Sequence, residues 1–221
     1  MRREVQVRSA VLCSGGLDSS VLLAEELARG HAVTPIHVRS GFVWEEAEAR
    51  TLARLLVHPP FRGLVTPLVT LTADVRDVYD ASHWALTGPP PGYDTPDDAV
   101  CLVGRNLMLL TKAAVWCRLH GVSRLVIGSL AGNPFPDATH DFFEQMSRTL
   151  SAGLAHEVRG EAPFLTMTKA AVVARGLALG VPLSLTLSCM NPGVDDAPCD
   201  RCSKCRERDQ CRMEAESSDS A

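Results

Sequence analysis

The sequence predicts an α/β protein with a parallel β-sheet and helices on both faces. Short apolar runs alternate along the chain with stretches whose apolar residues recur at helical spacing. The apolar runs lack polar residues at every second position, which is typical of strands buried on both faces. The 221 residues are enough for one substantial core and too few for two comfortable domains.

The expected elements follow from this alternation and from the glycines that end helices. In order, they are strand 9–13, helix 19–30, strand 32–38, helix 45–56, strand 64–71, helix 106–121, strand 124–129, and helices 140–155 and 168–180. Between them, residues 87–100 hold four prolines and two glycines and are expected to form a loop. A loop of this length in a compact domain is usually functional or mobile.

Composition excludes several classes of protein. The chain is 46% hydrophobic and 22% charged with a net charge of −4, so bulk charge gives no sign of a nucleic-acid partner. No run of about 20 apolar residues is present, which predicts that the chain does not span a membrane. The N-terminus is interpreted as the first strand rather than a signal peptide, so we expect a cytoplasmic protein with reduced cysteines.

A glycine- and serine-rich loop joins the first strand to the first helix. There, backbone N–H groups and the positive end of a helix can bind an anion, serine hydroxyls can donate, and Asp18 can hold the turn or a metal ion. The expected phosphate-binding residues are Ser14, Gly15, Gly16, Leu17, Asp18, Ser19 and Ser20. The patterns G-x-x-x-x-G-K-S/T and G-x-G-x-x-G are missing. The alternative is a plain glycine turn with a serine helix cap.

Four cysteines cluster near the C-terminus with the spacing C-x9-C-x2-C-x2-C. Cys189, Cys199, Cys202 and Cys205 suit a tetrahedral, structural Zn²⁺ site, with an iron–sulfur cluster and a redox dithiol as alternatives. Nearby basic residues are expected to offset the thiolate charge: Arg201, Lys204, Arg206 and Arg208. Cys13, Cys101 and Cys117 are interpreted as small buried hydrophobes, and Cys211 as a spare thiol.

The string SGGLDS resembles the SGG-x-DS loop of the PP-loop ATP pyrophosphatases. Together with the cysteine tail, it makes residues 9–208 similar to the 7-cyano-7-deazaguanine synthase family. Similar segments lie between the two ends, at residues 102–114, 124–129, 135–137 and 162–170. The resemblance implies a Rossmann-like fold of the adenine nucleotide alpha hydrolase type, with ATP, Mg²⁺ and Zn²⁺ as cofactors and a homodimer as the assembly.

The resemblance also implies how the chain is divided. Residues 1–185 would form the ATP-binding domain and residues 186–212 the zinc-binding segment. Residues 213–221 are expected to form a disordered tail because the chain after Cys205 is charged.

The implied reaction is an ATP-dependent ligation. A 7-deazaguanine carboxylate would be adenylated and converted with ammonia into the amide or nitrile. Lys169 would contact phosphate or a developing oxyanion, Arg105 an anion or a base, and Asp137 a ring N–H. The structural alternatives are a solvated Lys169, Asn106 as the cap of its helix, and Asp137 as the cap of the next helix.

Two segments depart from the family pattern: SGFVW (residues 40–44) and FPDAT (residues 135–139). Phe42 and Trp44 could stack on a planar base or form a core pair under a loop. Three other functions stay open, and the departures favour only the first of them. These are an enzyme that joins an acid to an amine on a protein or nucleic acid, a tRNA-thiolating enzyme, and a nucleotide-binding module without catalysis.

Overall fold

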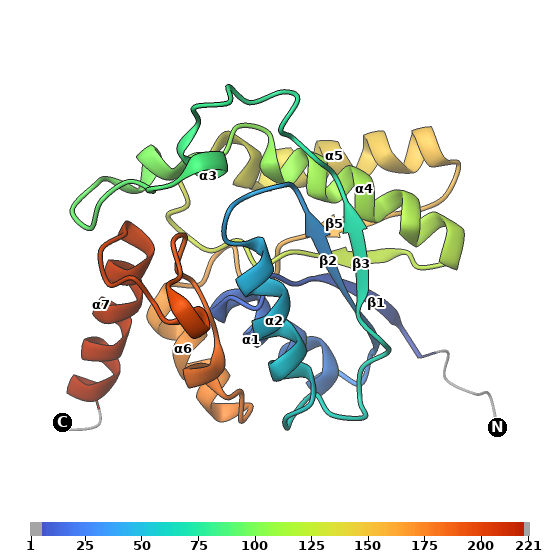
Figure 1. Cartoon of the computed structure of the whole chain (residues 1–221). Coiled ribbons are helices and arrows are strands. Elements are labelled where there is room, and N and C mark those ends of the chain that lie inside the picture. The colour runs from blue at the N-terminus through green and yellow to red at the C-terminus, as the bar shows by residue number, and fades with distance from the viewer. Residues whose placement is uncertain (1–5, 219–221) are drawn as a thin grey trace.

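A computed structural model describes residues 6–218, with side chains described as far as Gln210, and it confirms the parallel sheet. The strands are β1 (Arg8–Leu12), β2 (Ala32–Arg39), β3 (Val69–Thr72), β4 (Arg124–Val126) and β5 (Arg159–Glu161). They form a five-stranded sheet in the order β3-β2-β1-β4-β5, and every pair is parallel (Figure 1).

Helices cover both faces of this sheet. They are α1 (Leu17–Ala28), α2 (Glu45–Leu56), α3 (Trp84–Thr87), α4 (Arg105–His120), α5 (His140–Leu154), α6 (Lys169–Ala178) and α7 (Ser203–Ser218). One core lies between the sheet and α1, α2 and α6, and a second lies between the sheet and α4 and α5. In β1, Val11 enters the first core while Ala10 and Leu12 enter the second, as expected for a strand buried on both faces.

Three strands differ from their expected limits. β3 begins at Val69, and of the preceding predicted residues only Val65 bridges to the sheet, opposite Val33. β4 ends at Val126, after which the chain leaves the sheet. The sequence analysis missed β5, because its three residues include two charged ones and give no apolar run.

A buried carboxylate fastens α1 to the amino end of the sheet. Glu26 is fully buried and accepts hydrogen bonds from Ser9 Oγ (2.7 Å), Arg124 Nε (3.0 Å) and His31 Nδ1 (2.8 Å). Burial alone would raise the pKa of Glu26, but these donors, Arg124 foremost, hold it at about 2. Glu26 therefore holds α1, β1 and β4 together at the amino end of the sheet.

The C-terminal tail corrects one expectation. Residues 213–221 are expected to be disordered, whereas α7 continues to Ser218, and residues 219–221 lie outside the described part of the chain. From Ser203 onward the sequence contains no glycine or proline and carries three Arg and three Glu, which are strong helix formers. Charge alone therefore did not predict its structure. The domain boundary at residues 185 and 186 stays a prediction.

No helix between residues 6 and 218 combines the length and apolar character that would let it cross a membrane.

Candidate active site

A cavity of about 280 Å³ opens at the carboxyl ends of β1, β2 and β4. The chain runs outward from β1 through β2 to β3 and then returns to place β4 on the other side of β1. Ligands of open parallel sheets bind at such a switch point. The strand ends supply an apolar wall that includes Leu12, Val38 and Ile127, and the loop between β1 and α1 supplies a polar one.

The polar wall is the phosphate loop, residues 14–20. Gly15 has φ +79°, and a Cβ on it would lie 3.1 Å from the carbonyl oxygen of Glu48 and 3.2 Å from the backbone nitrogen of Leu52. Glycine is therefore required both by the left-handed backbone and by the close approach of α2. The hydroxyl of Ser20 donates to the Gly16 carbonyl at 2.8 Å, which helps to brace the turn.

Lys169 lies against this loop instead of in solvent. Its Nζ, at the start of α6, is 2.7 Å from Asp18 Oδ2 and 2.9 Å from Glu207 Oε1. Lys204 contacts the same Glu207 at 2.7 Å. Burial would raise the pKa of Glu207, but Lys204 and Lys169 lower it to about 2, so this carboxylate stays ionised. The interpretation of Lys169 as a solvated residue is wrong.

Asp137 caps a different helix from the one expected. Its Oδ2 accepts the backbone N–H of Asn106 at 2.9 Å, and its carbonyl accepts the Asn106 side-chain amide at 2.9 Å. Asp137 therefore binds the first turn of α4, and Thr139 caps the following helix, α5. Asn106 lies within that first turn and is not the N-cap, a position held by Gly104. Long-range capping of this kind leaves no local sequence signal.

Arg105 is the first residue of α4 and lines the cavity. Its guanidinium carbon lies 5.9 Å from the centroid of the Phe42 ring, and its Nε is buried without a hydrogen-bond partner. A half-buried guanidinium whose Nε–H has no partner suits contact with an anion or a carbonyl oxygen.

Phe42 and Trp44 form a buried pair. Their rings stack with centroids 5.0 Å apart, and Trp44 also stacks on Trp84 at 5.6 Å. Both side chains are at least 96% buried, with exposed fractions of 4% and 3%. The core-pair interpretation is therefore confirmed, although Trp44 also reaches the wall of the cavity.

Two further residues of the cavity wall were missed by the sequence analysis: His37 on β2 and Glu48 on α2. His37 is 2% exposed, and its Nδ1 lies 3.0 Å from the Cys13 carbonyl oxygen. Burial raises the pKa of Glu48 to about 8, with Arg105 opposing the rise and Glu45 adding to it. In the sequence, Glu48 looks like part of a solvated acidic helix face and gives no sign of a site. His37 does give a sign, because it is a polar residue inside an otherwise apolar strand.

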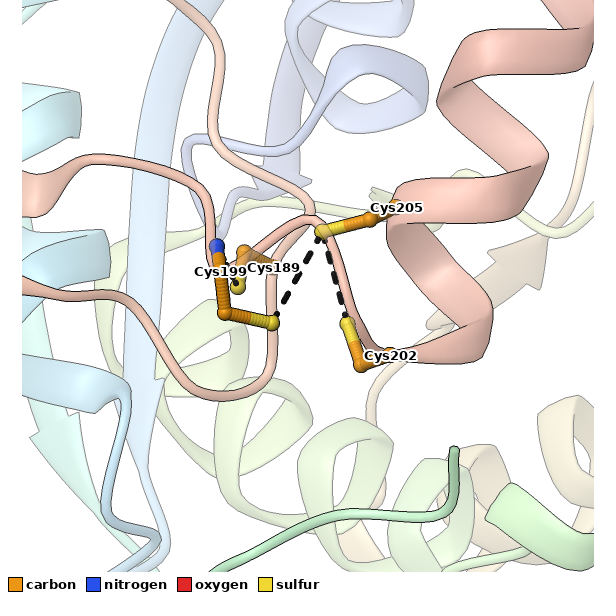
Figure 2. Close-up of side chains that lie close together, drawn as sticks. All are labelled: Cys189, Cys199, Cys202 and Cys205. Atoms are coloured by element: carbon orange, nitrogen blue, oxygen red, sulfur yellow. Dashed lines mark hydrogen bonds between the residues drawn. The ribbon is translucent and has the colours of Figure 1, made fainter. Parts of the chain in front are cut away.

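The four clustered cysteines converge, as the spacing predicts. Their Sγ atoms all lie within 4.8 Å of one another, with 3.5 Å between Cys202 and Cys205 and 4.0 Å between Cys199 and Cys205 (Figure 2). Tetrahedral zinc with Zn–S bonds of about 2.3 Å places sulfurs about 3.8 Å apart. Backbone N–H groups of Asn191 and Cys199 each lie 3.3 Å from Cys189 Sγ and offset thiolate charge. The donor set fits zinc.

Two of the basic residues around the cysteines, Arg206 and Arg208, have other partners. Arg206 donates to the carbonyls of Tyr93 (2.7 Å) and Thr95 (3.0 Å), and Arg208 donates to the Thr186 carbonyl. They therefore fasten neighbouring loops to α7, including the proline-rich loop at residues 87–100. That loop also pairs with the cysteine segment through a bridge between Gly92 and Cys202.

The remaining cysteines mostly follow expectation. Cys13 and Cys117 are buried, whereas Cys101 is half-buried because it lies at the end of the long loop. The side chain of Cys211 lies outside the described residues.

The comparisons with known proteins agree with this architecture. The family model for the queuosine biosynthesis protein QueC matches residues 8–216. The 7-cyano-7-deazaguanine synthase of Caldicellulosiruptor bescii is 30% identical over 91% of this chain and 90% of its own. That of Syntrophotalea carbinolica is 32% identical over 97% of this chain and 95% of its own.

A solved 4-thiouridine synthetase, in complex with RNA and bound ATP, is similar with a TM-score of 0.53 and 15% identity. The matched region covers 94% of this chain and 50% of the synthetase chain, and the similarity supports the fold alone. The matched family model and the curated relatives, which span nearly the whole chain, lead to one conclusion: the chain belongs to the QueC family of PP-loop, ATP-utilising proteins.

Proposed function

We propose that this protein uses ATP to adenylate the carboxylate of a 7-deazaguanine and then converts the activated acid with ammonia into the amide and nitrile. The observation that carries the proposal is the phosphate loop at the switch point of the sheet, beside a cavity with unpartnered polar groups. Those groups are Asp18 Oδ1, His37 Nε2 and Arg105 Nε. Family membership supports the substrate class.

The chemistry proceeds through two condensations. A carboxylate oxygen attacks the α-phosphorus of ATP and displaces pyrophosphate, and ammonia then attacks the acyl carbon, displaces AMP and leaves the amide. The amide oxygen then attacks the α-phosphorus of a second ATP and displaces pyrophosphate. Loss of both nitrogen-bound protons and departure of AMP, which carries away the amide oxygen, give the nitrile. Backbone N–H groups and hydroxyls of residues 14–20 would stabilise the charge that grows on the departing pyrophosphate.

Lys169 and Asp18 are proposed to act together on the phosphates. Lys169 is held 2.7 Å from Asp18, so its charge is positioned at the loop before ATP binds. Asp18 Oδ1 is buried and has no partner, which suits a carboxylate ligand of Mg²⁺. When bound, Mg²⁺ neutralises phosphate charge. Asp137 keeps a positioning role, because its carboxylate is occupied by α4.

Zinc would be held by the four cysteines in a structural role. Four sulfurs fill a tetrahedral ion and leave no open position for a substrate. Because Cys202 and Cys205 flank the start of α7, the metal would also fix the helix that carries Glu207 to Lys169.

A pyrophosphate-release assay tests the function. Zinc-loaded protein is supplied with ATP, Mg²⁺ and 7-carboxy-7-deazaguanine, with and without ammonium, and the products are identified by mass spectrometry. We expect pyrophosphate only when the deazaguanine acid is present, and amide or nitrile only when ammonium is added. Other carboxylates serve as controls. No acid-dependent pyrophosphate from metal-loaded protein would rule the reaction out.

A second candidate keeps the adenylation and changes the acceptor to an amine on a protein or nucleic acid. Its support is the SGFVW segment, which places an aromatic stack beside Arg105 where the family pattern carries polar residues. An ATP-dependent mass increase on the acceptor would distinguish it. A thiolating enzyme predicts a brown, iron-containing protein instead. The cytoplasmic location and the homodimer stay predictions.

A further inference from the structure

Buried polar groups without a partner gather along the wall of the cavity. Among the described side chains, the buried nitrogen and oxygen atoms without a partner belong to Asp18, His37, Arg105 and Ser203, and the first three of these residues line the cavity. Asp18 belongs to the phosphate loop. His37, Glu48 and Arg105 line the same cavity from β2, α2 and α4, and the charge of Arg105 acts on both of the other groups. Buried groups of this kind are costly unless a ligand satisfies them.

Glu48 is the acidic group left free at this position. Its neighbour Glu45, one turn earlier on α2, accepts the backbone N–H groups of Ser40 (2.6 Å) and Gly41 (2.8 Å). Glu48 is 8% exposed, and no hydrogen bond contributes to the pKa of its carboxyl. For packing alone, a leucine would serve on this face of α2, where Leu52 and Leu55 enter the core.

The hydrogen-bonding roles of the other two groups follow from their surroundings. The Cys13 carbonyl can only accept, so His37 Nδ1 carries the proton and donates to it at 3.0 Å. Burial lowers the pKa of His37, which keeps the ring neutral and leaves Nε2 as an acceptor. Arg105 Nε is a donor without a partner.

We infer that Glu48, His37 and Arg105 form a subsite that recognises the hydrogen-bonding edge of a guanine-type ring. That edge presents the N1–H and the 2-amino group as adjacent donors and the 6-oxygen as an acceptor. On ring binding Glu48 releases its proton to solvent, because the two adjacent donors stabilise its ionised form, and the carboxylate accepts both of them. His37 Nε2 accepts the second hydrogen of the amino group, and Arg105 donates to the 6-oxygen. An adenine edge offers a single exocyclic donor beside an acceptor and leaves this set unsatisfied. The inference rests on the proposed function and names the residues that select its substrate.

The test measures ring discrimination directly. Binding of 7-carboxy-7-deazaguanine and of its analogue without the 2-amino group is compared by calorimetry, without ATP, for the native protein and Glu48→Gln. A hydrogen bond to a charged group changes binding affinity by about tenfold or more, so the native protein should bind the amino compound that much more tightly than its analogue. Glu48→Gln should weaken binding of the amino compound by about tenfold or more and abolish the preference. Glu46→Gln, at an exposed position of the same helix, should leave both affinities unchanged.

Several outcomes overturn the subsite. One is a preference that survives in Glu48→Gln, and another is a loss of ATP affinity in that variant, which would assign Glu48 to the adenine. A third is a native protein that binds neither the two acids nor guanine. Thermal unfolding checks that the variant folds. If it does not, Glu48→Asp, which keeps the charge but withdraws it by one methylene, is put through the same comparison.

The two proposals fail separately. Pyrophosphate release with 7-carboxy-7-deazaguanine, together with an undiminished preference in Glu48→Gln, would keep the reaction and refute the subsite. A preference that depends on Glu48 in a protein that releases no pyrophosphate would keep the subsite and refute the reaction.

Discussion

The two ends of the cavity are built in different ways. At the phosphate loop, partners lie within five residues of one another, such as the Ser20 hydroxyl on the Gly16 carbonyl and the Ser14 amide on the Ser19 hydroxyl. At the other end, His37, Glu48 and Arg105 come from three elements, and each keeps a group that the protein does not satisfy. Phosphate binding is thus a property of local chain geometry, whereas the second end is a product of tertiary packing.

Gly15→Ala changes the phosphate loop and should have the largest effect on activity. The left-handed backbone at φ +79° strains any side chain, and a methyl group would lie only 3.1 Å from the backbone of α2, which would have to shift. Backbone strain and a displaced loop should lower the rate of pyrophosphate release by about a hundredfold or more, because moving reacting groups by about 1 Å can slow a reaction by that factor. Steady-state kinetics of pyrophosphate release measure this loss.

Gly30→Ala is the matched control for this variant. Gly30 also has a left-handed backbone, at φ +78°, but nothing lies within 4 Å of its Cβ position. It should lose some stability and keep its activity per folded molecule. Equal losses of activity in both variants would show that strain, and not the contact with α2, is responsible.

Cys202→Ser tests whether the metal centre supports the cavity. Removing one of four sulfurs should abolish stoichiometric zinc, measured by elemental analysis, and lower the unfolding temperature, because binding free energy at such a site is folding free energy. Cys101→Ser, outside the cluster, should keep its zinc. Iron in the native protein, seen as visible absorption, would contradict the zinc assignment.

Glu207→Gln tests the link from α7 to the phosphate loop. Its carboxylate holds Lys169 at 2.9 Å, opposite Asp18 at 2.7 Å. Losing one of two partners should let Lys169 move, with pyrophosphate release falling about tenfold and zinc content unchanged. Lys169→Met should be more severe, because it removes the charge itself. If Glu207→Gln were as active as the native protein, Asp18 alone would suffice to position Lys169.

The contrast between the two ends also explains what the sequence could predict. Most strands and helices, the phosphate loop and the cysteine cluster depend on residues close together in the chain, and the sequence pattern predicted them; β5 and the end of α7, which lack an apolar pattern, were not predicted. The pairing of Asn106 with Asp137, the contact of Lys169 with Glu207 and the burial of Glu48 depend on how distant helices pack. An acidic run such as E-E-A-E is the same string whether its third glutamate faces solvent or a cavity.

The smallest expected effect concerns Glu48 and the pH dependence of stability. Its pKa is about 8 in the folded protein against an ordinary value of 4.5, so between these values the folded state keeps a proton that the unfolded chain has released. Stability therefore falls as pH rises through this window and levels off above it. The charged and titratable groups that act on Glu48 are Arg105 on α4 and Glu45 on α2, and His37 on β2 shares the cavity wall.

Glu48→Gln removes this dependence, because an amide has no proton to release, while Arg105, Glu45 and His37 contribute to both proteins. The unfolding temperature of the variant should match that of the native protein near pH 5 and exceed it by a few degrees at pH 8. Calorimetric scans across this range, without ligand, give the difference. If the difference in unfolding temperature between the two proteins stayed constant or shrank with rising pH, Glu48 would already be ionised in the empty cavity. The carboxyl would then already have a partner, and the ring subsite would lose one of its three unsatisfied groups.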